Sequence, residues 1–468
     1  MKLVKKSWTI LLLFAMLCTF VIACENTTDN NDSNKQVRSA DENTAPNQES
    51  EETDTPKETP LVEGTADNPV TITVAFPWGE EIFNNRFQEI DEKLPNINIE
   101  MVACECKSAS LQELFASGVN PDIIFPNYGV HEIENLGVIY PLDELAKNHN
   151  FDINSLNPGL VSSIRSLDIE GRLIGIPDGT GYLSLFYNKE IFDLFGIPYP
   201  TETMTWDQAF DLAKKMTGQR NGISYLGLEL GGYGNTGDGA AVPIKELAVN
   251  KTDPDTGEVL ITKDPAFTKY LELMKKYYSI PGVRSEEAKN GELFGQKQAA
   301  MTVTWTAYFV HGNPFEDVEY LKNKVAMLPV PVWADQPTTG PVLGTTPMVI
   351  SSSSEHKDAA FSVLKEYVSV PNQTKIAQSM ASGPAITEVA DLYGSAIENY
   401  VGQDVTSVFK LTPANYQTRQ SLWDQYVNLD LAKFADSDMN VQEFLRITKE
   451  EGEAAVAEAK TQLGNTKK

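Results

Sequence analysis

Strand-like and helix-like segments alternate over residues 70–125, and this alternation constrains the fold more than any other feature of the chain. The order is strand, helix, strand, helix, strand, at residues 70–76, 81–94, 97–102, 111–115 and 122–125. Strands separated by helices at this spacing pair in parallel within one open sheet. The sequence therefore predicts an α/β fold, in which ligands are expected at the carboxyl ends of the strands.

Helix-end signals predict further helices in the rest of the folded body. They are a capping box at Thr205–Gln208 opening a helix to Met216, an Asp264–Pro265 start, a helix over 358–368 stopped by Pro371, and a long charged helix over 442–463. The body begins near Pro69 and holds about 400 residues, which is longer than a chain usually folds around a single hydrophobic core. We therefore expect two lobes.

The amino terminus has the pattern of a signal peptide. Lys2, Lys5 and Lys6 precede sixteen uncharged residues at 8–23, a run shorter than the ~20 apolar residues of a membrane-spanning helix. The run ends in Val-Ile-Ala-Cys at Cys24, which resembles the lipobox of bacterial lipoproteins. That resemblance implies cleavage before Cys24 and a diacylglycerol group on its sulfur. The alternative is an ordinary signal peptide followed by a chance cysteine.

Residues 25–68 have the composition of a flexible tether. They contain twelve acidic and three basic residues and no aromatic residue. Such a segment cannot bury enough apolar surface to offset the entropy lost on ordering. Together with lipidated Cys24, it predicts a globular body held at a membrane surface by a solvated spacer.

The charge balance restricts the partners. Lys and Arg total 38 and Asp and Glu total 65 in 468 residues, giving a formal net charge of −27. Phosphate backbones are bound by basic surfaces, so no nucleic-acid partner is expected. Four Cys argue against a disulfide-built scaffold, and four scattered His argue against a His-rich metal site. We expect no metal, no cofactor and a monomeric protein.

Three motifs resemble binding or redox sites, but ordinary loops, turns and buried thiols explain them more simply. Residues 232–237 match G-x-G-x-x-G, but a glycine loop that exposes Tyr233 is favoured over a dinucleotide site in a secreted chain. Residues 253–258 gather oxygen ligands without EF-hand spacing, so a turn is favoured over calcium. Cys104 and Cys106 would point to one face if they lay on a strand, and they are interpreted as two partly buried thiols rather than a strained disulfide.

Aromatic residues in Gly- and Pro-rich loops at predicted strand ends are more informative. A flat ring suits the apolar C–H face of a sugar, whose hydroxyl groups then need hydrogen-bond partners. Packing between lobes is the alternative for each ring, and packing is favoured for Trp206 and Trp333. The predicted ligand-binding residues are Trp78, Tyr128, Tyr182, Tyr233 and Trp305, with Trp423 as a weaker candidate.

A series of short motifs in the body resembles the extracellular solute-binding proteins, family 1. The most specific stretch runs from Leu173 to Thr217, and looser similarity covers roughly residues 70–465. The motifs are Leu173–Pro177, Leu183–Lys189, Ile191–Phe192, Gly196–Pro198, Thr205–Asp207, Ala213–Lys215, Phe294–Met301, Leu328–Pro331, Ala359–Phe361 and Leu364–Lys365.

The resemblance implies a two-lobed periplasmic-binding-protein-like fold of type II with an interlobe cleft that closes by hinge motion. One lobe is expected to comprise 69–178 and 347–384, and the other 183–340 and 385–468. The hinge crossings are then at 179–182 and 341–346. Leu183–Lys189 is a scaffold motif in the family and places no ligand contact.

The same resemblance implies a function. It is capture of a sugar or oligosaccharide at the outer face of a bacterial cell membrane, and its delivery to the permease subunits of an ABC importer. A cationic or metabolite solute is the alternative ligand. A surface-anchored glycan-active enzyme is the alternative class, because acid pairs such as Glu80–Glu81 occur and their separation across a cleft cannot be read from sequence.

Overall fold

The computed structural model describes residues 63–231, 238–311, 315, 317–380 and 382–466. Cys24, Tyr233 and almost all of the predicted tether lie outside these residues. The end of the tether, at 63–68, belongs to the folded body. The backbone carbonyl of Glu63 accepts a hydrogen bond from Asn96 Nδ2 at 2.8 Å, and its carboxylate contacts His356 Nδ1 at 2.5 Å. The body therefore begins slightly earlier than Pro69.

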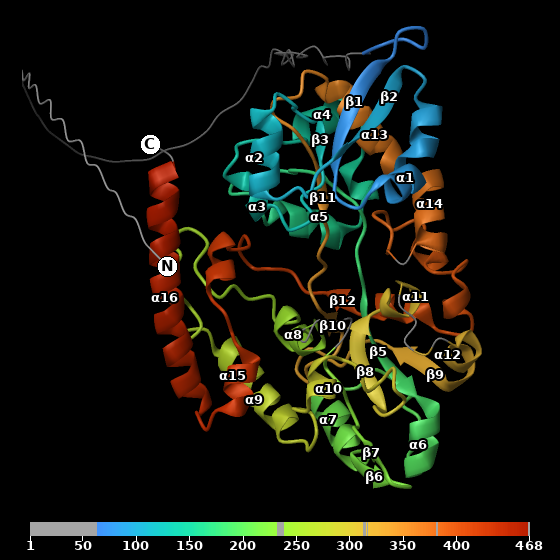
Figure 1. The fold of residues 1–468 in the computed structure, drawn as a ribbon, viewed down its shortest axis with the longest axis vertical. Helices are drawn as coiled ribbons and strands as arrows, with labels where there is room; N and C mark the ends of the chain where they lie inside the picture. Colours follow the sequence, from blue (N-terminus) through green and yellow to red (C-terminus); the bar gives the residue numbers. More distant parts are fainter. Residues whose placement is uncertain (1–62, 232–237, 312–314, 316, 381, 467–468) are drawn as a thin grey trace, which may run out of the picture. The chain divides into compact units, whose positions relative to one another are not determined.

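The predicted parallel sheet is present and takes in two strands from farther along the chain. Its strand order is β2-β1-β3-β11-β4. The neighbours β1–β2 and β1–β3 are parallel, which confirms the α/β prediction, whereas β11 runs antiparallel to β3 and β4. In Figure 1, β11 is the orange strand among the blue and teal ones. The bounds are β1 Val70–Phe76, β2 Ile97–Ala103, β3 Ile123–Ile124, β4 Ile176–Pro177 and β11 Pro347–Ile350.

Alternating side chains divide the apolar residues of this sheet between its two faces. Ile72 and Val74 join the larger core on one face, whereas Ala75 joins a smaller core with Leu111 on the other. We call the sheet and its helices the first lobe. The helices are α1 Glu80–Lys93, α2 Ser108–Ala116, α3 His131–Glu134, α4 Asp143–Asn148, η1 Ile153–Ser155, α5 Pro158–Arg165, α13 Lys357–Tyr367 and α14 Val370–Ser379.

A second sheet has a separate core, and we call it and its helices the second lobe. Its order is β8-β5-β9, with both pairs antiparallel. The strand bounds are β5 Leu183–Asn188, β8 Met301–Trp305 and β9 Val325–Leu328, with the smaller pairs β6 Gly218–Arg220 and β7 Ile223–Tyr225, and β10 Thr339–Gly340 and β12 Thr412–Pro413.

Helices of the second lobe follow several of the predicted signals. Thr205 caps α7 through the expected reciprocal bonds with Gln208, and Asp264 Oδ1 accepts from Ala266 N at the start of α9. The bounds are α6 Lys189–Phe195, α7 Trp206–Lys215, α8 Asp238–Lys245, α9 Pro265–Tyr278, α10 Glu286–Lys289, α11 Tyr308–His311, α12 Val318–Lys324, α15 Leu431–Asp436 and α16 Val441–Thr466, with 3-10 turns η3 Glu398–Tyr400, η4 Val405–Lys410 and η5 Leu422–Tyr426. The remaining 3-10 turn, η2 Ala390–Leu392, packs against the first core through Leu392.

The chain passes between the two cores in segments that lie side by side. Asp178 N donates to Thr346 O at 3.1 Å, and Thr180 exchanges two backbone hydrogen bonds with Gly383 at 3.0 and 2.7 Å. A third passage follows Val389, which packs in the first core, whereas Tyr393 packs in the second. This passage lies later than the expected 384/385 boundary, because the intervening apolar side chains still pack against the first lobe.

The structure adds detail to two local predictions. Cys104 and Cys106 do not share a strand face, because β2 ends at Ala103 and Cys106 has a left-handed φ of 57° in the following turn. Both thiols are free, with Cys106 buried and Cys104 half-buried. The helix over 357–367 ends before Pro371, as predicted, and Pro371 itself belongs to the next helix. It lies in the first turn of α14, where its missing N–H is tolerated.

Candidate ligand-binding site

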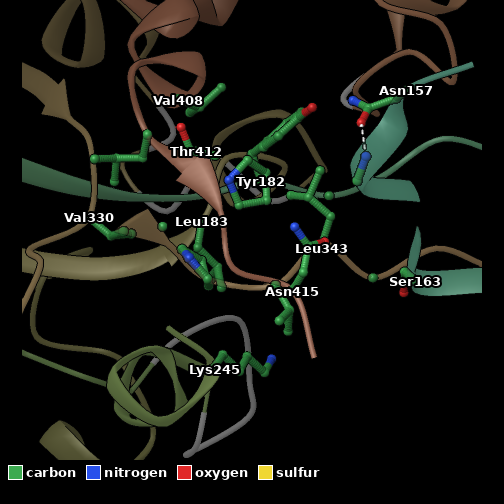
Figure 2. A pocket seen from close by; sticks show the side chains of 18 of the residues that line it. Asn157, Ser163, Tyr182, Leu183, Lys245, Val330, Leu343, Val408, Thr412 and Asn415 are labelled. Atoms are coloured by element: carbon green, nitrogen blue, oxygen red, sulfur yellow. Dashed lines mark hydrogen bonds between the residues drawn. The ribbon is translucent and has the colours of Figure 1, made fainter. Parts of the chain in front are cut away.

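A cavity of about 730 Å³ is lined by residues of both lobes and of the segments that pass between them. Figure 2 shows Asn157 and Ser163 entering from the teal first-lobe segment and Lys245 from the green helix α8. The lining residues are Asn157, Pro158, Gly159, Ser162, Ser163, Gly181, Tyr182, Leu183, Lys245, Trp305, Pro329, Val330, Gly340, Pro341, Val342, Leu343, Gly344, Val408, Phe409, Leu411, Thr412, Pro413, Asn415, Tyr416 and Gln420.

Tyr182 lines the cavity and is also firmly packed. Its ring lies edge-on to Tyr393 and Phe409, with centroid separations of 5.6 and 5.1 Å. A Cβ on Gly383 would lie 2.1 Å from the Tyr182 ring, so a side chain at that position cannot coexist with the ring. Burial raises the pKa of the Tyr182 phenol. Tyr182 is therefore a neutral, fixed wall of the cavity.

Trp305 lines the cavity from the end of β8 and is half-buried. Its Nε1 donates to Asp238 Oδ2 at 2.7 Å, which fixes the rotation of the indole. A Cβ on Gly181 would lie 2.9 Å from two carbons of the indole ring, so the ring rests directly against the backbone there. Lys245 Nζ lies 5.6 Å from the ring centroid.

Lys245 belongs to a helix that is fixed by its neighbours. Its backbone carbonyl accepts from Val342 N at 3.2 Å, which connects the end of α8 to the passage that precedes β11. Burial lowers the pKa of the Lys245 ammonium, and the charge of Asp238 partly opposes this shift.

The first-lobe side of the cavity is small and polar. Asn157 caps α5 by accepting from Gly159 N at 2.9 Å, and Ser162 and Ser163 follow in the same helix. Gln420, from the second lobe, donates its backbone N–H to Ser166 O at 2.7 Å and its Nε2 to Ser166 Oγ at 2.8 Å. Hydroxyl and amide groups here can bond the hydroxyls of a small molecule.

The structure brings together two of the predicted aromatic residues, Tyr182 and Trp305, and places others elsewhere. Trp78 packs edge-on to Phe76 at 5.1 Å, and Tyr128 is 49% exposed with Lys107 Nζ 4.2 Å from its ring centroid. Neither is among the residues that line the cavity, nor is Trp423, which packs against the second core. Ligand contact by Trp78, Tyr128, Tyr233 and Trp423 stays a prediction. Trp206 and Trp333 are buried, as expected.

Sequence reasoning missed Lys245, Phe409, Tyr416 and the α5 residues. Tyr416 follows Pro413 in a loop, so the aromatic-in-loop signal that selected Trp305 also applies to it. Asn157–Pro158 is an N-cap signal that locates a helix start. Lys245 carries no signal of this kind, because its place depends on how α8 packs.

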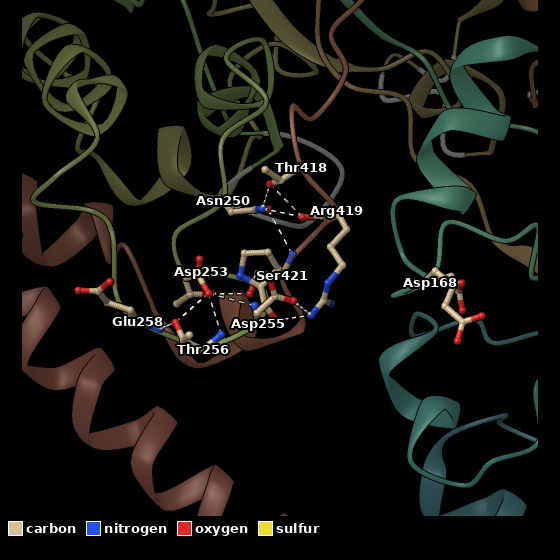
Figure 3. A network of polar contacts seen from close by, with 12 residues as sticks. Asp168, Asn250, Asp253, Asp255, Thr256, Glu258, Thr418, Arg419 and Ser421 are labelled. Carbon is tan, nitrogen blue, oxygen red and sulfur yellow. Dashed lines mark hydrogen bonds and ion pairs between the residues drawn. The ribbon is translucent and has the colours of Figure 1, made fainter. Parts of the chain in front are cut away.

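The acidic turn at residues 253–258 is satisfied internally. Asp253 Oδ1 accepts from Thr256 N and Oγ1, both at 2.7 Å, and these bonds lower the pKa of Asp253. Arg419 pairs with Asp255 at 2.9 Å (Figure 3). Lys263 pairs with Glu258. Among the described residues, no group of His, Cys, Asp or Glu is arranged to hold a metal ion.

Comparison with protein families gives a match over residues 87–402, which is more than half of the chain, to the model described as bacterial extracellular solute-binding protein. The chain belongs to this family. Its members bind solutes, so this solute-binding protein is not an enzyme, and the family is secreted or periplasmic. Within the described residues, no helix has both the length and the apolar character needed to cross a membrane.

Solved structures share the fold of this solute-binding protein at low sequence identity. The sugar-binding protein MalE of Xanthomonas citri superposes with a TM-score of 0.66 at 15% identity, covering 84% of this chain and 99% of that one. A Rhizobium etli sugar transporter in an open conformation superposes with a TM-score of 0.62 at 21% identity, covering 82% of this chain and 99% of that one. A Listeria monocytogenes ABC substrate-binding protein in complex with cycloalternan superposes with a TM-score of 0.60 at 19% identity, covering 83% of this chain and 100% of that one.

A relative from Brucella abortus (strain 2308), named as a binding protein, is 26% identical over 310 residues, which are 62% of this chain and 67% of the relative. The resemblance seen in the sequence motifs is thus confirmed at the level of the family and the fold.

Proposed function

We propose that this protein is the sugar-capturing, lipid-anchored component of an ABC importer. It holds a sugar or oligosaccharide in the cavity around Trp305, closes its lobes about the passages at 179–182 and 341–346, and presents the closed form to the permease subunits. The observation that carries the proposal is the half-exposed indole of Trp305, held by Asp238, in a cavity whose volume of about 730 Å³ suits a small ligand.

The structural neighbours support a carbohydrate ligand. CpMnBP1 is a structural neighbour with mannotriose bound, the Listeria monocytogenes protein is in complex with cycloalternan, and the Xanthomonas citri protein is a sugar-binding protein. The indole offers a flat apolar surface for a sugar ring, while Asn157, Ser162 and Ser163 offer hydrogen-bond partners across the cavity. Closure of the lobes then adds contacts to the bound state, which shifts the population toward the form that an importer recognises.

Tryptophan fluorescence titrated with mono- and oligosaccharides, including mannotriose and cycloalternan, tests the sugar-binding part. At least one sugar should give a saturable signal. Trp305→Ala should weaken its binding about tenfold or more with little change in melting temperature. Tyr199→Ala is the control, since Tyr199 is an exposed aromatic residue that does not line the cavity, and it should keep the wild-type affinity. No response to any sugar, or an unstable Trp305→Ala protein with unchanged affinity, contradicts the proposal.

The anchor is tested separately. Cys24→Ala should stop lipidation and release the protein from the membrane fraction, whereas Cys18→Ala, within the apolar run, should leave it there. Metabolic labelling with a lipid precursor, read beside the fractionation, identifies the modification. If the Cys24→Ala protein remains as firmly bound to membranes as the wild type, the lipoprotein assignment is wrong.

A further inference from the structure

The cavity contains one charged side chain although the chain is strongly acidic. Among the described residues that line it, Lys245 carries the sole formal charge, and none of the lining residues is acidic. The whole sequence has 65 acidic and 38 basic residues, so a site drawn at random from it would favour carboxylates. The cavity therefore differs in sign from the protein as a whole.

Lys245 forms no ion pair with any carboxylate of the described residues. The charge of Asp238 acts on the pKa of Lys245, but Asp238 Oδ2 already accepts the hydrogen bond of Trp305 Nε1. The neighbouring residues 232–237 contain no acid in their sequence. The ammonium group thus loses water on burial without gaining a full ionic partner from the part of the chain that the structure describes.

Three buried aromatic side chains fix the helix that carries Lys245. Tyr270 OH donates to Ala240 O at 2.9 Å, and Trp333 Nε1 donates to Pro243 O at 2.8 Å. Trp206 Nε1 donates to the carboxyl of Glu246 at 2.8 Å. Because these bonds hold α8 on both sides of the lysine stem, the positive charge is positioned in advance beside the Trp305 ring.

We propose that the ligand is an anionic sugar, in which Trp305 contacts a ring and Lys245 pairs with a carboxylate or sulfate group on it. This inference rests on the sugar-binding function proposed above. A desolvated ammonium gains more from an anion than from a hydroxyl, because only the anion adds the attraction between two opposite full charges, which is stronger in a cavity shielded from water than in bulk solvent. A cationic solute is disfavoured by the same charge.

The test compares sugars that differ only in charge. Trigalacturonate and triglucuronate are each measured by calorimetry beside the carboxyl-reduced trisaccharide, and 6-O-sulfated maltotriose beside maltotriose. In the wild type, the charged member of at least one pair should bind about tenfold or more tighter than its neutral parent, which corresponds to about 1.4 kcal/mol. The uronate and sulfate arms identify which anion is recognised.

Variants assign the preference to the lysine. Lys245→Met should reduce the charged-to-neutral affinity ratio to about twofold or less, and Lys245→Arg should keep the preference. Lys263→Met makes the same change in net charge outside the cavity and should behave as wild type. Circular dichroism verifies folding of each variant.

The outcomes separate the two proposals. Equal or tighter binding of the neutral member in every pair, or a charge preference that survives Lys245→Met, overturns the anionic-sugar inference and leaves sugar binding intact. Absence of binding by all charged and neutral sugars overturns the proposed function itself, and the inference with it.

Discussion

Trp78 and Trp305 each lie at the carboxyl end of a strand, and each has a basic side chain near its ring. The Arg86 guanidinium carbon lies 4.8 Å from the Trp78 centroid, and Lys245 Nζ lies 5.6 Å from that of Trp305. Only Trp305 lines the cavity. The local sequences, an aromatic beside Pro, Gly or Thr at a strand end, do not distinguish them.

The difference lies in where the nearby aspartate makes its hydrogen bonds. In the first lobe, Asp178 accepts from Arg86 itself and from Tyr367. In the second lobe, Asp238 accepts from the indole of Trp305 instead of from Lys245. Arg86 is therefore committed to the fold, whereas Lys245 remains available to a ligand. Binding and packing clusters thus share the same residue types and differ in which groups are already satisfied.

The largest expected effect concerns alkaline pH and the residue after Lys245. Glu246 is buried, and its burial raises the pKa to about 9, partly offset by the bond from Trp206. In the unfolded chain the pKa is near 4.5. Unfolding therefore releases a proton between these pH values, and the stability held by the neutral carboxyl is lost as pH rises from 4.5 through 9.

Glu246→Gln keeps a neutral acceptor for Trp206 at all pH values. Its melting temperature, followed by circular dichroism, should match that of wild type near pH 5 and exceed it at pH 9. Glu258→Gln, which alters an exposed carboxylate, should follow the wild-type profile. If the melting temperatures of wild type and Glu246→Gln changed in parallel with pH, Glu246 would be ionised in the folded protein.

Arg86→Met should come next in effect. It leaves the Asp178 carboxylate, whose side chain is 11% exposed, without its cation, and removing one partner of a buried ion pair costs about 3 kcal/mol or more. Urea unfolding measures the loss. Lys245→Met serves as the matched change and should lower the free energy of unfolding by less than ~1 kcal/mol. Equal losses of unfolding free energy in the two variants would mean that Lys245 stabilises the fold as much as Arg86 does.

Trp78→Ala should destabilise the first lobe by about 2 kcal/mol, below the value for a fully buried tryptophan because the ring is half-buried. The lost contacts are with Phe76, Phe125 and Arg86. Sugar affinity should change less than about threefold. An affinity loss as large as that of Trp305→Ala would instead place Trp78 at the ligand, as the sequence predicts.

Gly181→Ala should give the smallest effect. The new Cβ would lie 2.9 Å from the Trp305 ring, so the ring must shift, and affinity should fall about threefold with little change in stability. Gly344→Ala is the control, because it lines the same cavity and an added Cβ there meets no atom within 4 Å. The same affinity loss in both variants would show that Trp305 does not depend on Gly181.

The first part of the fold could be predicted because its information is local. β1 has the predicted bounds, and the alternation over residues 70–125 is sufficient to predict parallel pairing. β11 could not be placed this way, since it enters the sheet beside β3 after more than 200 intervening residues. The turn at Cys106 was missed because extended and left-handed conformations are hard to distinguish from residue type alone at a strand end.

The candidate site could be predicted only in part. The aromatic-in-loop signal found Tyr182 and Trp305, but it selected Trp78 equally, because no local pattern reports which neighbours will surround a ring. Lys245 was missed for the same reason. Its position in the cavity depends on Trp333 and Tyr270, which contact α8 from distant parts of the sequence.

The hydrogen bonds from Gln420 to Ser166 have a consequence for the residence time of a bound ligand. They join the second lobe to the first through residues outside the segments that pass between the cores, and Gln420 also lines the cavity. Separating the lobes along this edge has to break these bonds. Gln420 is therefore expected to influence how long a captured molecule stays more strongly than how many molecules are held at equilibrium. Under the proposed delivery to an importer, residence time sets how often the permease subunits meet the protein with its ligand bound.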